Sequence, residues 1–221
     1  GNVRQKLRSA KRAAARNPFF AGNVDALIAA QPKDLEASEI EVRLGATWLD
    51  KKYIEQFMYE TFETPRYLRG QIEISYVPYT AEWQVSRKSM VRYNDVAAFT
   101  TYGTDRASAY RLLEDALNLR DIRIYDTIED ADGRERRVLN AKETTLAAQK
   151  QQLIRDAFKD WIWKDPERRE TLVRQYNEEM NSTRPREYDG SHIVFSGMNP
   201  EITLREHQKN AIAHVLYGGN T

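Results

Sequence analysis

Cysteine is absent from this chain of 221 residues. The absence excludes disulfide bonds, thiolate zinc sites and cysteine nucleophiles, and it is consistent with a reducing compartment. Long apolar runs are absent too: none approaches the ~20 residues that a membrane-spanning helix needs, and no secretory signal peptide opens the chain. The sequence therefore predicts a cytoplasmic protein with no membrane partner.

Motifs of several enzyme classes are also missing. The sequence has no G-x-x-x-x-G-K-[ST] phosphate loop, no DEAD- or DEAH-like magnesium box, no H-E-x-x-H zinc site and no G-x-S-x-G nucleophile. The three histidines are scattered, and the two that share a face of a predicted helix, His207 and His214, have no third ligand nearby. We therefore expect neither a bound metal nor catalysis by this chain alone.

Neither sign of charge is in excess, because the chain has 34 Lys and Arg and 33 Asp and Glu, which gives a net charge of +1. A uniformly basic surface is excluded, so any contact with nucleic acid must come from a local patch. One such patch precedes the first acid, Asp25, in an Ala-rich run that is predicted to be helical. Its cations are Arg4, Lys6, Arg8, Lys11, Arg12 and Arg16.

This basic helix has two interpretations. Six cations on about four turns attract phosphate, with an affinity that falls as salt rises. Alternatively, the helix is a solvated one that is held in place by Val3, Leu7 and Ala10 or Ala14, and its cations pair with acids elsewhere. The sequence leaves both interpretations open.

The pattern of apolar residues predicts an α+β fold that is mostly helical. Alternation with a period of two predicts small antiparallel hairpins at about 71–87 and 121–139. The two longest helices are expected at about 141–164 and 166–181, where Asn140 and Asp165 are suitable caps, and they are expected to pack as a helical hairpin. No β-α-β rhythm supports a doubly wound sheet.

Four segments follow from this pattern and from the length of the chain. They are a basic N-terminal helical segment (1–31), an α+β region (32–140), the helical hairpin with a linker (141–199) and a closing helix (200–221). In the closing segment Thr203 and Glu206 have the spacing of a capping box, which predicts a helix from Leu204. Apolar periodicity through Gln208 and Val215 predicts that this face of the helix is buried.

The run Leu204-Arg205-Glu206-His207-Gln208 resembles the Q motif of superfamily 2 helicases and Snf-type DNA translocases, which often reads L-R-x-[HY]-Q. The resemblance implies that Gln208, with Arg205 in the same motif, binds the adenine of ATP, since one C=O and one NH₂ can pair with adenine together. It further implies that an upstream aromatic, Phe195 or Tyr188, stacks on the adenine. ATP and Mg²⁺ are expected for a longer parent protein, whose Walker A strand would begin just after Thr221.

Three further runs, at 39–49, 112–120 and 184–190, are similar to segments of the very large helicase–DNA methylase proteins of phages and conjugative elements. In those proteins such a region leads into a Snf-type helicase core. Because no methylase N-P-P-[YF] tetrad occurs here, the hydrolase and methyltransferase activities would belong to other parts of the parent.

The resemblance implies a non-catalytic region that binds or positions DNA for an ATP-dependent helicase or translocase, with DNA and a RecA-like ATPase lobe as partners. The alternative is a structural or protein-interaction domain of a large mobile-element protein that makes no direct contact with DNA. A third interpretation is an independent nuclease that uses dispersed carboxylates.

Overall fold

The computed structural model describes residues 2–130, 133–183, 191–193 and 203–218. The chain divides into two compact units: unit 1 comprises residues 1–33 and 182–221, and unit 2 comprises residues 34–181. The fold class is α+β, as predicted, with helices predominating and two small antiparallel sheets. The finer division into four segments stays a prediction.

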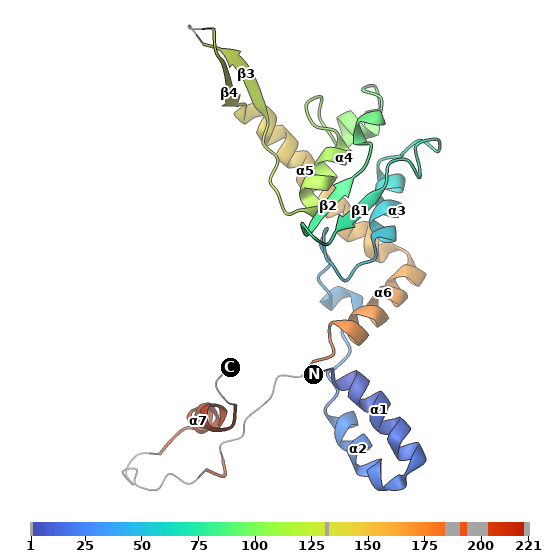
Figure 1. Ribbon diagram of the computed structural model, residues 1–221, viewed down its shortest axis with the longest axis vertical. Helices are drawn as coiled ribbons and strands as arrows, with labels where there is room; N and C mark the ends of the chain where they lie inside the picture. Colours follow the sequence, from blue (N-terminus) through green and yellow to red (C-terminus); the bar gives the residue numbers. More distant parts are fainter. Residues whose placement is uncertain (1, 131–132, 184–190, 194–202, 219–221) are drawn as a thin grey trace. The chain divides into compact units, whose positions relative to one another are not determined.

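Unit 2 contains both sheets and most of the helices (Figure 1). Its regular helices and strands are α3 (Lys51–Thr61), β1 (Ile74–Val77), β2 (Glu82–Val85), α4 (Ala109–Leu117), β3 (Tyr125–Glu129), β4 (Glu135–Leu139), α5 (Ala141–Lys164) and α6 (Pro166–Glu179). Short helical turns lie at Ala37–Glu39, Lys88–Met90 and Ala97–Thr101.

Both predicted hairpins are confirmed. β1 pairs with β2 in a register that places Ile74 opposite Val85, and β3 pairs with β4 in a register that places Tyr125 opposite Leu139. The first hairpin contributes to the core, because Ile74, Trp83 and Val85 are buried. The second extends from the start of α5 (Figure 1). Its described residues at 127–130 and 133–139 are all exposed.

The core of unit 2 lies between α3, α4, α5 and the β1–β2 hairpin. Phe57 of α3 is fully buried at its centre, with edge-to-face contacts to Phe62 and Phe158 at centroid distances of 6.0 and 5.1 Å. Such pairs contribute about 0.5–1.5 kcal/mol beyond the area that they bury. This aromatic cluster joins α3 to the long helix α5.

Helices α5 and α6 begin at the predicted caps. α5 is the longest described helix with 24 residues, whereas α6 has 14, the same length as α1. Oδ1 of Asn140 accepts a hydrogen bond from the backbone N–H of Glu143 at 3.0 Å, and Oδ1 of Asp165 accepts one from the N–H of Arg168 at 2.7 Å. Pro166, whose fixed φ suits a first helical position, starts α6 directly after α5. The chain therefore turns sharply at Asp165 with no intervening loop.

Unit 1 contains three helices and one short turn in its described part. They are α1 (Val3–Arg16), a 3₁₀ turn (Pro18–Phe20), α2 (Ala21–Ala29) and α7 (Glu206–Gly218). α1 and α2 lie side by side as a helical hairpin (Figure 1). The backbone N–H of Val3 donates to the carbonyl of Ser182 at 2.8 Å, which joins the start of α1 to the end of the segment that follows α6.

The closing helix differs from its prediction in two respects. It begins at Glu206 rather than Leu204, so the expected Thr203–Glu206 capping box does not start it. The expected buried face is also wrong, because Gln208 is exposed and Val215 is 80% exposed, whereas Ala213 is buried. The apolar period indicates that a helix forms, but which face is covered depends on what the helix packs against.

Candidate nucleic-acid interface

The basic segment folds as a helix because its ends have suitable caps and its interior is rich in alanine. At the start, Oδ1 of Asn2 accepts from the N–H of Gln5 at 2.9 Å. At the end, Asn17 adopts an extended conformation ahead of Pro18, which cannot continue the helix. The predicted basic helix therefore forms over α1.

One face of α1 packs against α2. Val3, Leu7, Ala10 and Ala14, the residues expected to hold the helix, are all half-buried. No residue within these two helices is fully buried, because two helices alone cannot enclose a side chain. The hairpin is thus a thin element with most of its surface open.

Four arginines recur every fourth residue on the other side of α1. We call this row, Arg4, Arg8, Arg12 and Arg16, the arginine ladder. Residues four apart lie one above the other on a helix, and each step rises about 6 Å. Arg8, Arg12 and Arg16 are exposed and present their cationic side chains to solvent, whereas Arg4 is half-buried.

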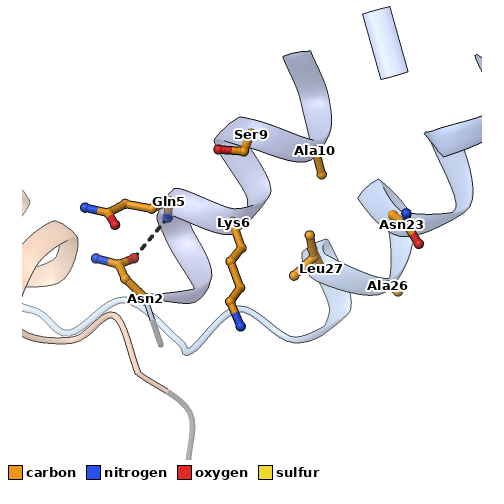
Figure 2. A pocket seen from close by; sticks show the side chains of 8 residues that line it. All are labelled: Asn2, Gln5, Lys6, Ser9, Ala10, Asn23, Ala26 and Leu27. Atoms are coloured by element: carbon orange, nitrogen blue, oxygen red, sulfur yellow. Dashed lines mark hydrogen bonds between the residues drawn. The ribbon is translucent and has the colours of Figure 1, made fainter. Parts of the chain in front are cut away.

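The two lysines of the basic patch lie on different sides of the helix. The helical period places Lys11 beside the ladder, close in direction to Arg4. Lys6 instead lines an open groove between α1 and α2 (Figure 2). The structure thus brings five of the six predicted cations to one side of α1.

Most of these cations lack acidic partners. In the part of the chain that the structure describes, Lys6, Lys11, Arg12 and Arg16 have no carboxylate within 4.0 Å. The half-buried Arg4 uses Nη2 to donate to the carbonyl of Pro32 at 3.5 Å. The described residues therefore give no support, at Lys6, Lys11, Arg12 and Arg16, to the interpretation in which the cations pair with acids elsewhere.

The charge arrangement of α1 is unfavourable for an isolated helix. Like charges four residues apart destabilise a helix by about 0.2–0.5 kcal/mol per pair, and the ladder contains three such pairs in succession. The first turn of α1 also lacks an acid that would complement the helix dipole. A bound polyanion would remove both penalties.

The groove between α1 and α2 has a mixed polar and apolar lining and a volume of about 600 Å³. It is lined by Asn2, Gln5, Lys6, Ser9, Ala10, Asn23, Ala26 and Leu27 (Figure 2). Amide, hydroxyl and ammonium groups are those that proteins use on phosphate and sugar oxygens. The groove therefore adds polar groups to the hairpin, on a side of α1 that differs from the side of the arginine ladder.

Two aromatic side chains at the tip of the hairpin were not singled out in the sequence. Phe19 is 86% exposed and Phe20 is 38% exposed, and their rings meet edge to face at 5.6 Å. The sequence indicates their exposure only through their position, directly after a basic helix and a helix-breaking Asn17-Pro18 pair. Apolar periodicity does not indicate this exposure, because a three-residue turn has no repeat.

The Q-motif residues of α7 are exposed at the start of the helix. Oε1 of Gln208 accepts a hydrogen bond from the backbone N–H of Arg205 at 2.9 Å, so Gln208 caps the helix from its third position. Both side chains are exposed. The aromatic candidates Phe195 and Tyr188 lie outside the described residues.

Across the ranges that the structure describes, no group of three or more His, Asp or Glu is arranged to hold a metal ion. None of the described helices combines the length and the apolar character needed to cross a bilayer.

One protein family matches the chain, and its description is Domain of unknown function (DUF8437). The match covers residues 43–182, which is more than half of the chain and most of unit 2. No curated protein and no solved structure matches the chain. The helices α1, α2 and α7 lie outside the matched residues.

Proposed function

The chain belongs to the DUF8437 family, and we propose that it is a non-catalytic region that binds and positions DNA for an ATP-dependent DNA helicase or translocase. The observation that carries the proposal is the arginine ladder of α1, with Lys11 beside it; within the described residues, Lys11, Arg12 and Arg16 have no acidic partner. In this assignment unit 2 is the scaffold, and the α1–α2 hairpin is the element that touches DNA.

The affinity would come from the counterions that the DNA backbone releases when the arginines neutralise its phosphates. Each phosphate neutralised on B-DNA changes the slope of log K against log salt by about −0.9. A ladder of four arginines with one neighbouring lysine can neutralise several phosphates along one backbone. The protein needs no net positive charge for this, because salt screens charges beyond about 10 Å and only the local patch counts.

The motor itself would be a RecA-like ATPase lobe in the parent protein, in the cytoplasm, and the support for this part is the similarity of residues 204–208 to a Q motif. Gln208 would bind adenine once that lobe is present, with Arg205 beside it and Phe195 stacked on the base. ATP and Mg²⁺ would bind mainly to that lobe. A methyltransferase activity, if the parent has one, would lie elsewhere.

Fluorescence anisotropy of labelled DNA, measured over a series of salt concentrations, tests the proposal. The double variant Arg8→Glu with Arg12→Glu is expected to lose at least about tenfold in affinity for DNA at 0.1 M salt. The slope of log K against log salt is expected to become less negative by about 2. The matched control is Arg66→Glu with Arg92→Glu, two exposed arginines of unit 2 whose replacement changes the net charge equally. Unchanged affinity and slope in the ladder variant would overturn the proposal.

The rival function is a structural or protein-interaction domain without DNA contact. One observation favours it, namely that the β3–β4 hairpin exposes the apolar side chains of Ile128, Val138 and Leu139. A two-stranded hairpin has little stability of its own, so a partner that covered these side chains would stabilise it. An apolar arm of this kind suits a protein partner. The rival is supported if the ladder variant and its control bind DNA equally.

A further inference from the structure

The tip of the α1–α2 hairpin exposes Phe19 more than almost any other large apolar side chain in the described chain. An exposed Phe gains none of the free energy that burial would give it, although single exposed apolar residues are common on proteins. What distinguishes Phe19 is its position three residues after Arg16, the last rung of the arginine ladder. An apolar ring and a line of cations are thus consecutive on one element.

The backbone at Phe19 is held in place by its neighbours. Oδ1 of Asn17 accepts from the N–H of Phe19 at 3.0 Å, and the carbonyl of Asn17 accepts from the N–H of Phe20 at 3.2 Å. Pro18 restricts the backbone ahead of it, and the rings of Phe19 and Phe20 meet edge to face. A side chain presented on such a turn loses little conformational entropy when it binds.

We infer that Phe19 stacks on an unpaired base while the arginine ladder holds the phosphates that follow, so that the preferred ligand is single-stranded DNA or a single-stranded DNA end. The inference rests on the proposed function, because it adds a base contact to the proposed phosphate contact. Proteins that bind single strands without sequence preference combine a basic track with aromatic side chains on which bases stack. The hairpin contains both parts in order.

An unpaired base suits this tip better than an intact duplex. Insertion of a side chain between stacked base pairs requires the pairs to unstack, which costs free energy at each step, whereas an unpaired base already exposes its face. A protein partner fits less well, because the ring is adjacent to a row of cations rather than to a wide apolar surface. Charge complementarity therefore selects a polyanion that carries flat apolar groups.

The test compares single-stranded with duplex oligonucleotides of the same length, each with one 2-aminopurine as a fluorescent base. The intact protein is measured beside Phe19→Ala, Phe19→Tyr and Tyr79→Ala, since Tyr79 is a 98% exposed aromatic of unit 2 and serves as the matched control. Phe19→Ala is expected to weaken single-strand binding by about tenfold and to abolish quenching of 2-aminopurine. Its salt slope and duplex affinity stay unchanged, and Phe19→Tyr keeps both signals.

Three outcomes overturn the inference. If Phe19→Ala binds single strands as well as the unaltered protein does while Arg8→Glu with Arg12→Glu loses binding, the stacking role fails and the proposed function stands. If Tyr79→Ala causes an equal loss, the effect is not specific to the tip. If the unaltered protein binds neither DNA at 50 mM salt, the proposed function fails together with the inference.

Discussion

Oε1 of Gln208 and the backbone N–H of Arg205 form a hydrogen bond of 2.9 Å at the first turn of α7. Both residues belong to the run that resembles a Q motif, and the bond gives Gln208 a role within this chain. An amide oxygen has two lone pairs, so the cap leaves one of them and the whole NH₂ group for a ligand. Capping and the proposed adenine contact are compatible in one rotamer.

Replacement of Gln208 by alanine is expected to weaken the first turn of α7. One hydrogen bond of this kind contributes about 1 kcal/mol, which corresponds to a roughly fivefold change in local opening. Hydrogen exchange at the N–H of Arg205 should accelerate by about that factor. Gln208→Glu keeps an acceptor at the same position and should keep the protection, whereas equal exchange in the alanine variant would contradict the capping role.

The adenine contact is tested in the parent protein with its ATPase lobe. Gln208→Ala should reduce the preference for ATP over GTP, because the amide that pairs with adenine is lost while the phosphate-binding groups remain. The measurement is the ratio of kcat/KM for the two nucleotides. Gln151→Ala is unsuitable as a control because Gln151 is buried, but the exposed Gln84→Ala should leave the ratio unchanged.

Arg168 is expected to stabilise the corner between α5 and α6. Its guanidinium lies 3.6 Å from the ring centroid of Trp161, while Nε donates to the carbonyl of Ile162 at 3.0 Å and Nη2 donates to the carbonyl of Trp161. Lysine cannot reproduce a stacked planar group with several fixed donors. Arg168→Lys should lower the free energy of unfolding by about 1–3 kcal/mol in urea, whereas the exposed neighbour Arg169→Lys should change it little.

Tyr110 is expected to make the stability of unit 2 fall in alkaline solution. Burial raises the pKa of Tyr110 to about 12, and a hydrogen bond with Thr64, whose Oγ1 lies 2.7 Å from the phenol oxygen, opposes part of that rise. The folded chain holds the phenol proton of Tyr110 more tightly than the unfolded chain does. The contribution of this group to the free energy of unfolding is therefore complete below pH 10 and is lost as the pH rises from about 10 to 12.

Between pH 9 and pH 11 the loss should be on the order of 1 kcal/mol, and it should be absent in Tyr110→Phe. That variant is expected to start about 1 kcal/mol less stable, since the hydrogen bond between Tyr110 and Thr64 is lost. Urea unfolding at pH 9 and pH 11 measures both effects. Tyr79→Phe, at an exposed tyrosine, should behave as the unaltered protein does, and parallel pH profiles for Tyr110→Phe and the unaltered protein would contradict the assignment.

Gly45 and Gly70 provide a matched pair for the cost of a side chain at positive φ. Their φ values are +82° and +80°, but a Cβ at Gly45 would lie 2.2 Å from the carbonyl oxygen of Leu117, whereas one at Gly70 would meet nothing within 4 Å. Gly70→Ala should therefore cost about 1 kcal/mol for the backbone alone. Gly45→Ala should cost several kcal/mol more than Gly70→Ala by urea unfolding, because Leu117 belongs to α4 in the core; equal costs would contradict this.

Much of the fold could be predicted because its signals are local. Asn140 and Asp165 cap their helices as their residue types suggest, and the hairpins at 71–87 and 121–139 follow from a period of two. Each of these features depends on hydrogen bonds or side-chain spacing within a few residues. Local physical chemistry is contained in the sequence itself, and it determined where α5 and α6 begin, where the two hairpins form, and that the basic run at 4–16 is helical.

What lies beyond a few residues was decided by tertiary structure. The apolar period of α7 did not reveal that Gln208 and Val215 are exposed, because the burial of a face depends on a distant partner. The same holds for Phe19, whose exposure follows from the antiparallel packing of α1 on α2. The sequence by itself determined the caps of α5 and α6, the strand pairs and the row of arginines. Only the three-dimensional packing decided which side chains remain accessible to a ligand, because burial is a property of contacts between distant segments.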